Sequence, residues 1–184
     1  MIHKAPSARS KSVSRIVPHP TLIAPLSGAQ WASFPELTRS RQGRELSEAR
    51  YRNGASFLLA IEDLRFPDPA DLLYQTGIVA QMALSSHLLD VGFDDRWCAQ
   101  NIGLHIGRAL SYANATGLNY QSPELDQLAP VLSPYNKWRN PDLHGSRPPL
   151  PASLPNIPLL LRDLLDHVRA VTGHIRPKRS KGHG

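Results

Sequence analysis

The sequence predicts an all-α protein, a compact bundle of four to five helices with a proline-rich strap and disordered basic tails. Two observations support this prediction. Apolar residues recur at three- and four-residue steps from about residue 43 to residue 172, and no run of residues alternates with the period of two that is typical of strands. The helix starts and stops also carry suitable capping residues. With 184 residues, 41% of them hydrophobic, the chain is long enough for one domain with a sizeable core.

The composition divides the chain into three parts. Residues 1–35 are rich in proline and serine and contain no acidic residue, so we expect a flexible basic arm. Its Leu22, Ile23, Leu26 and Trp31 are candidates to lie across the core. Residues 36–173 are expected to form a single helical domain, and residues 174–184 a basic C-terminal tail.

The first helix is expected over residues 44–65, where the apolar positions become periodic toward the C-terminal end. Gly54 interrupts this pattern, and because glycine weakens a helix interior, we expect fraying or a kink there.

The next two helices have well-defined ends. Asp68 is an N-cap acceptor before Pro69, and the helix that follows is expected to stop at Gly92, a residue suited to the left-handed conformation. Asp94 is expected to cap a third helix over residues 95–116, which ends at Gly117.

Prolines punctuate the remainder of the chain. A short helix is expected from Ser122 to about Leu132, followed by a single turn that contains Tyr135 and Trp138. Residues 141–158 hold six prolines and are expected to form a loop or extended strap. The last helix is expected over residues 158–172.

Positive charge is confined to the two ends of the chain. The formal net charge is +6, yet residues 36–173 contain 13 basic and 15 acidic residues, a net charge of −2. Basic tails of this kind bind nucleic acid or another polyanion because each cation that neutralises a phosphate releases a counterion. The alternative is that they are solvated, solubilising ends. The tails contain Lys4, Arg9, Lys11, Arg15, Arg176, Lys178, Arg179 and Lys181.

Several function classes find no support in the sequence. The single cysteine, Cys98, excludes a disulfide scaffold and is expected to be a small core hydrophobe. No two of the eight histidines stand four residues apart, so we expect no metal site and no cofactor. Cys98 and His105 would lie on one helix face about 10 Å apart, too far to share an ion. His87 and His105 are expected to be partly buried and hydrogen-bonded.

Gly103 and Gly107 are expected to lie on one helix, where two small residues at this spacing let a neighbouring helix approach closely. The close contact is a helix-packing groove within the fold or, alternatively, the interface of a homo-oligomer.

Residues 138–145 read Trp-Arg-Asn-Pro-Asp-Leu-His-Gly. The Arg-Asn-x-x-x-His-Gly pattern resembles the active-site signature of HEPN-domain ribonucleases, small all-α proteins of toxin and phage-defence systems. The resemblance implies metal-independent RNA cleavage, in which Arg139 holds the scissile phosphate, Asn140 orients it and His144 is the general acid or base. The alternative is a turn over residues 140–142.

Aromatic and basic residues also alternate around this segment. Interleaved aromatic rings and cations can stack bases and hold phosphates, but the same aromatic residues can instead anchor the proline-rich strap to the bundle. The candidate binding residues are Tyr135, Lys137, Trp138, Arg139 and Arg147.

The leading hypothesis is a small non-enzymatic helical module that binds a protein or a nucleic acid, with the basic tails adding affinity. The alternatives are the HEPN-like ribonuclease and a structural or assembly subunit. No apolar run approaches the roughly 18 residues of a membrane span, so we expect no membrane partner. The expected location is the cytoplasm, with an organelle as the alternative because the N-terminus has the composition of a transit peptide.

Overall fold

The computed structural model describes residues 34–63, 66–144 and 149–175. These residues form six α-helices and two short 3-10 helices, with no strand among them, which confirms the all-α prediction. The elements are α2 (Arg41–Asp63), α3 (Pro69–Val91), α4 (Asp95–Asn101), α5 (Ile106–Ala115), α6 (Pro123–Val131), η1 (Tyr135–Trp138), η2 (Pro141–His144) and α7 (Ile157–Thr172). The expectations for the basic arm up to residue 33, including its four apolar anchors, and for residues 176–184 lie outside the described residues.

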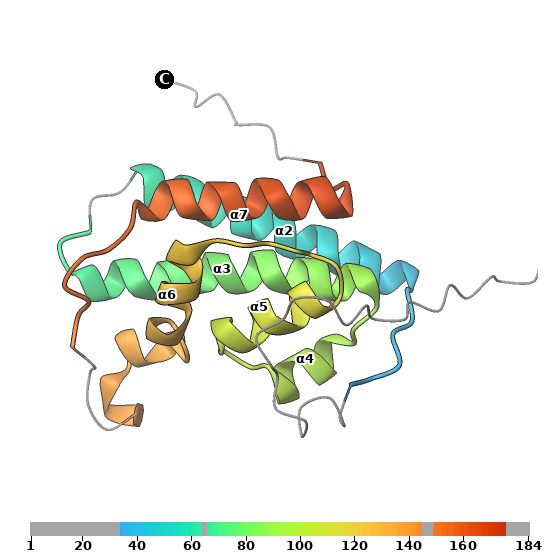
Figure 1. Cartoon of the computed structure of the whole chain (residues 1–184), viewed down its shortest axis with the longest axis horizontal. Coiled ribbons are helices and arrows are strands. Elements are labelled where there is room, and N and C mark those ends of the chain that lie inside the picture. The colour runs from blue at the N-terminus through green and yellow to red at the C-terminus, as the bar shows by residue number, and fades with distance from the viewer. Residues whose placement is uncertain (1–33, 64–65, 145–148, 176–184) are drawn as a thin grey trace, which may run out of the picture.

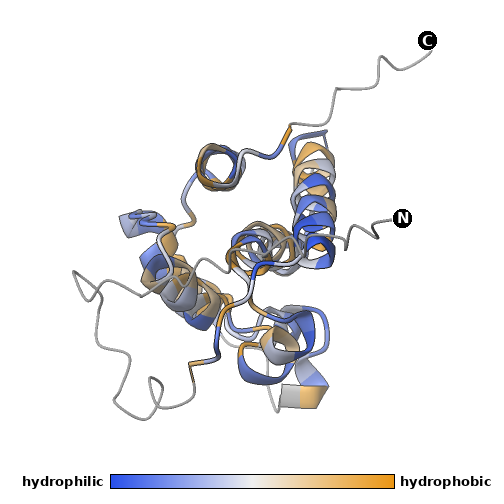
Figure 2. Cartoon of the chain, turned by 90° about the vertical axis from the view of Figure 1, so that its right-hand side faces the viewer, coloured by the Kyte–Doolittle hydropathy of each residue, from blue (hydrophilic) through white to orange (hydrophobic). Residues whose placement is uncertain are grey.

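Helix α3 is the centre of the molecule, with α2 and α7 on one side of it and α4, α5 and α6 toward the other (Figure 1). The view along the bundle in Figure 2 shows α3 surrounded by the other helices. A helix with neighbours on several sides must be apolar around most of its circumference. Accordingly, 13 of its residues are buried, among them Leu73, Val79, Leu84 and Leu88.

The expected caps of α3 are present in the structure. The Asp68 carboxylate accepts a hydrogen bond from the Ala70 N–H at 2.8 Å, and Pro69 occupies the first turn. Gly92 ends the helix with a φ of 113°, in the left-handed region. A Cβ on Gly92 would also lie 2.8 Å from the Thr38 backbone, so glycine is required here for space as well as for conformation.

The prediction of a single helix over residues 95–116 is wrong, because the chain turns between α4 and α5. Gly103 adopts a φ of 58°, and its N–H donates to the Cys98 oxygen at 3.0 Å, which closes the end of α4. Cys98 and His105 therefore do not share one helix face. Gly103 and Gly107 likewise do not lie on one helix, so the prediction of a glycine groove is also wrong.

The kink expected at Gly54 is absent, since α2 is continuous through this residue. Gly54 is buried, and a Cβ at this position would lie 3.2 Å from the Met82 Cβ and 3.4 Å from a Leu165 methyl carbon. The missing side chain instead allows α2 to approach α3 and α7 closely.

The second half of the domain follows the expected order. Ser122 caps α6, because its hydroxyl oxygen accepts a hydrogen bond from the Leu125 N–H at 3.2 Å. Asn156 caps α7, where its side-chain oxygen accepts from the Leu159 N–H at 3.2 Å. The strap contains the short η2 helix, and beyond it Leu154 packs against the core.

Candidate functional site

The N-terminal segment attaches to the bundle at the C-terminal end of α3. The Phe34 ring lies 5.5 Å from the Phe93 ring and 5.9 Å from the Tyr112 ring, measured between centroids. A few residues later, the Thr38 N–H donates to the Gly92 oxygen at 3.3 Å. Residues 1–33, which carry four basic side chains and no acidic one, therefore join the described fold at this end of the bundle.

The C-terminal segment attaches at the same end of the bundle but on the side of α2 and α7, through His174 (Figure 1). This side chain is 4% exposed, its ring lies 5.6 Å from the Tyr51 ring, and its Nε2 lies 2.7 Å from the Ser47 Oγ. Ser47 and Ser86 join α2 to α3, because each hydroxyl donates to the other residue's backbone oxygen, at 2.6 and 2.9 Å. The second basic tail, residues 176–184, follows directly.

Arg44 connects the helices that meet at this end. Its guanidinium pairs with the Asp90 carboxylate near the end of α3 and donates to the Thr172 oxygen at 2.7 Å, at the end of α7. The start of α2 and the ends of α3 and α7 are therefore held together, on the right-hand side of Figure 1. Both basic tails thus leave the described fold from the same end.

The Ser47 and His174 pair does not have the geometry of a nucleophile and its base. Both serine hydroxyl protons are directed to backbone oxygens, so the His174 Nε2 carries a proton and donates it to the Ser47 Oγ. Ser47 is also fully buried. Burial and the nearby Arg44 lower the pKa of His174, which keeps the ring neutral and attached near neutral pH. The pair is a structural connection between α2, α3 and the C-terminus.

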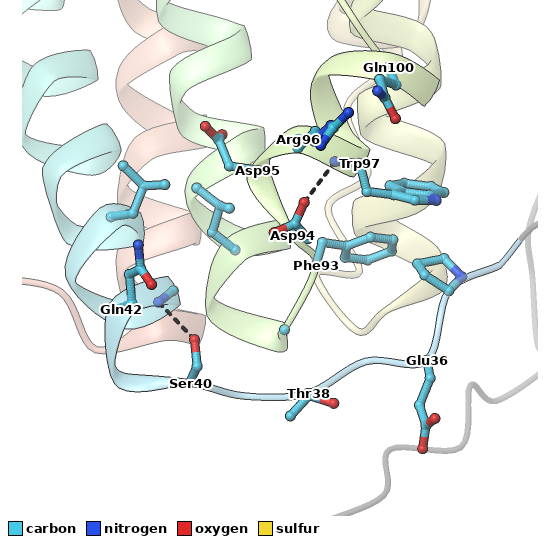
Figure 3. Close-up of a pocket in the computed structure, with 15 residues that line it drawn as sticks. Glu36, Thr38, Ser40, Gln42, Phe93, Asp94, Asp95, Arg96, Trp97 and Gln100 are labelled. Carbon is cyan, nitrogen blue, oxygen red and sulfur yellow. Dashed lines mark hydrogen bonds between the residues drawn. The ribbon is translucent and has the colours of Figure 1, made fainter.

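A cavity of about 550 Å³ opens at the same end, between the segment that precedes α2 and the start of α4 (Figure 3). Phe93 and Trp97 provide an aromatic wall, with their rings 5.0 Å apart. The charged lining consists of Glu36, Asp94, Asp95 and Arg96, of which Asp94 caps α4 by accepting from the Trp97 N–H at 3.0 Å. Three carboxylates against one guanidinium make the cavity unfavourable for a phosphate.

The aromatic members of the predicted binding set lie in the core. Trp138 is 1% exposed and donates to the Val131 oxygen at 3.0 Å. Tyr135 is 7% exposed, and its hydroxyl donates to the Gln81 side chain. Neither ring can stack on a base without leaving the core, which favours the anchoring interpretation for these two residues.

The basic members of that set lie nearer to solvent. Lys137 donates to the Ser133 oxygen at 3.0 Å, beyond the end of α6, and burial lowers its pKa. Arg139 is exposed, with its guanidinium carbon 5.3 Å from the centre of the Tyr74 ring. Arg147 lies outside the described residues.

The HEPN-like motif spans the end of one short 3-10 helix, the junction after it and a second short 3-10 helix. Arg139 and Asn140 are exposed between η1 and η2, and His144 is the last residue of η2. The Asn140 N–H donates to the Asn136 oxygen at 2.9 Å, which fixes the backbone at this junction.

Other candidate chemistry is limited in the part of the chain that the structure describes. The Cys98 thiol is buried, and burial raises its pKa to about 12, so it is a poor nucleophile. No three metal-ligating side chains gather among these residues. None of their helices combines the length and apolar character that crossing a bilayer requires.

Comparisons with protein-family models, with curated protein sequences and with solved structures give no match to this chain.

The attachment of the two tails to one end of the bundle could not be predicted from sequence patterns. Ser47 lies 39 residues from Ser86 and 127 residues from His174, far beyond the spacings within one helix. The one available signal was Gly173, which marks the end of α7 and therefore the start of the C-terminal tail.

Proposed function

We propose that this protein is a non-enzymatic helical module that binds a polyanion, with nucleic acid as the expected class, through two basic tails acting together. The observation that supports this proposal is the attachment of Phe34 and His174 to the same end of the bundle. This role fits the cytoplasmic location expected from the sequence.

The charge distribution gives the proposal its physical basis. Residues 1–35 and residues 174–184 each carry four basic residues and no acidic one, whereas the residues between them carry a net charge of −2. Eight cations that start from one end of a rigid bundle can contact one stretch of phosphates. Once one tail is bound, the other is held at a high effective concentration near the same ligand.

The folded part of this end does not attract phosphates by itself. The cavity in Figure 3 has more carboxylates than guanidinium groups in its lining, and Arg44 is already paired with Asp90. Affinity for a polyanion at this end must therefore come from the tails.

The test is the salt dependence of binding to labelled single-stranded RNA. If all eight tail cations contact phosphates, the slope of log K against log salt concentration is about −5 to −6. Changing the four basic residues of one tail to glutamine is expected to reduce the slope by about 3, and changing all eight to remove nearly the whole slope. A matched control is Arg52→Gln, which removes an exposed charge from the middle of α2.

The length of the RNA tests whether the tails act together. Because both tails start from one end, an oligonucleotide of about 12 residues is expected to give nearly the same slope as one of about 40. Equal binding by the chain with all eight substitutions would overturn the proposal. So would the absence of binding by the unmodified chain, which would favour a protein partner or an assembly role.

A second candidate function is a HEPN-like metal-independent ribonuclease. It is favoured by the exposure of Arg139 and Asn140 next to the helix that holds His144. The same RNA, incubated in EDTA and run on a denaturing gel, would be cleaved by the unmodified protein and left intact by His144→Ala. Unchanged cleavage by that variant, with the helical content preserved, would refute this candidate.

A further inference from the structure

We propose that His105, Arg108 and Lys137 form a phosphate-binding site on the folded domain, separate from the two tails. The inference rests on the proposed function for the identity of its ligand, a phosphodiester of the bound polyanion. The site itself is argued from the contacts of three side chains that come from two distant parts of the sequence.

Arg108 lies over the turn that joins α4 to α5. Its Nη1 donates to the Asn101 oxygen at 2.7 Å, so the side chain reaches back across the turn that contains His105. Arg108 is exposed, which leaves the other guanidinium N–H groups available to a ligand.

Lys137 reaches the same place from η1. Its Nζ donates to the Ser133 oxygen at 3.0 Å, and the Ser133 Oγ accepts from the Gly107 N–H at 3.2 Å. These two bonds hold the ammonium group beside the first turn of α5, which follows His105 directly. The turn and η1 thus bring three potential cations together.

The positive charges of Arg108 and Lys137 both act on His105. Its pKa is lowered first by burial and then by the positive charges of Arg108 and Lys137. The pKa of Lys137 is lowered by burial alone. The lowered pKa keeps the ring neutral at neutral pH, so the positive charge of this cluster comes from Arg108 and Lys137.

The two positive charges of this cluster are not neutralised by an ion pair within the described residues. Among the described residues, no ion pair involves Arg108 or Lys137, whereas five other arginines are paired. Those pairs are Arg41–Glu45, Arg44–Asp90, Arg50–Asp95, Arg162–Glu62 and Arg169–Asp166. A concentration of positive charge without nearby acids attracts a dissolved anion.

A phosphate suits the donors of this site. The planar guanidinium offers paired N–H groups, the ammonium is a compact point charge, and the imidazole can add a third donor. A phosphate between them would offset the repulsion that lowers the pKa of His105. Binding is therefore expected to raise that pKa and to be accompanied by proton uptake.

The experiment follows the imidazole resonances of His105 by NMR against pH in the full chain. The probes are inorganic phosphate and an oligothymidylate of about ten nucleotides. We expect either probe to raise the pKa of His105, and Arg108→Gln to remove most of that rise and to weaken oligothymidylate binding by about tenfold at low salt. Arg52→Gln is the control, because it removes a distant exposed arginine.

A second variant tests whether Arg108→Gln acts only by disturbing the turn around His105. Lys137→Gln is expected to reduce the rise in the same way, while His105 remains in place as the reporter. A pKa of His105 that neither probe changes in the unmodified chain would overturn the inference, as would an equal effect of Arg52→Gln and Arg108→Gln.

The outcomes also separate this inference from the proposed function. Salt-dependent RNA binding that requires the tails but leaves the His105 resonances unchanged would support the proposed function and refute the phosphate site. A response of His105 in the chain with all eight tail substitutions would support the site even if the tails proved dispensable.

Discussion

Acidification is expected to destabilise this protein chiefly through His87, the most deeply buried of the three histidines whose pKa is lowered. It lies in the middle of the bundle on α3 and is 1% exposed. Its Nε2 lies 3.3 Å from the Thr116 hydroxyl, whose own proton is donated to the Tyr112 oxygen at 2.8 Å. The Nε2 must therefore carry the proton of the neutral ring, and the Nδ1 has no hydrogen-bond partner. Protonation would add a charge and a donor without an acceptor.

The size of the effect follows from the pKa of His87, which is lowered from 6.5 to about 4. Burial is the main cause; Asp90 and hydrogen bonds with the Thr116 and Ala113 backbone oppose it, and Arg39 adds to it. This lowering of the pKa corresponds to about 3 kcal/mol. Since the unfolded state takes up the proton first, this part of the free energy of unfolding is present above pH 6.5 and is lost as the pH falls toward 4.

The assay is urea unfolding of the full chain at several pH values between about 7 and 4, followed by circular dichroism. His87→Gln is expected to be less stable at neutral pH but to lose the largest part of the pH dependence in this interval, the remainder coming from His174 and His105. His105→Gln is a control, because His105 is much less buried and contributes less. If His87→Gln kept the full decline in stability, the argument from burial and the unpartnered Nδ1 would be wrong.

Three further substitutions test the packing and the helix ends by the same unfolding assay. Gly77→Ala would place a Cβ 2.3 Å from the Cβ and Cγ of Tyr135, so we expect a loss of about 1–3 kcal/mol; unchanged stability would show that η1 moves freely. Gly117→Ala meets no atom within 4 Å, so its cost should reflect only the φ of 97°, about 1–2 kcal/mol. Ser122→Ala removes the cap of the Leu125 N–H and should cost about 1 kcal/mol, an effect that Ser122→Thr should avoid because it keeps the hydroxyl that also donates to Glu124.

Local features of the fold could be predicted because they depend on residues only a few positions apart. The cap at Asp68, the proline after it and the glycine at residue 92 define α3 from sequence, and Ser122 defines the start of α6 in the same way. The separation of positive charge into two tails is likewise a property of the sequence alone.

Whether a helix ends or continues at a glycine could be seen only in the folded structure. Gly103 ends a helix because its backbone enters the left-handed region, while Gly54 lies in an unbroken helix because α3 and α7 occupy the space beside it. Glycine permits both outcomes, so its presence in a helical pattern does not decide between them.

The candidate sites depended most on the tertiary structure. Sequence placed Trp138 and Lys137 in one set, but packing buries the first and brings the second beside His105 and Arg108, about thirty positions away. Sequence also showed two basic tails, but only the contacts of Phe34 and His174 brought their starting points to one end of the bundle. The physical reason is that helix ends are set by interactions over three or four residues, whereas the meeting of distant side chains is set by how the helices pack around α3.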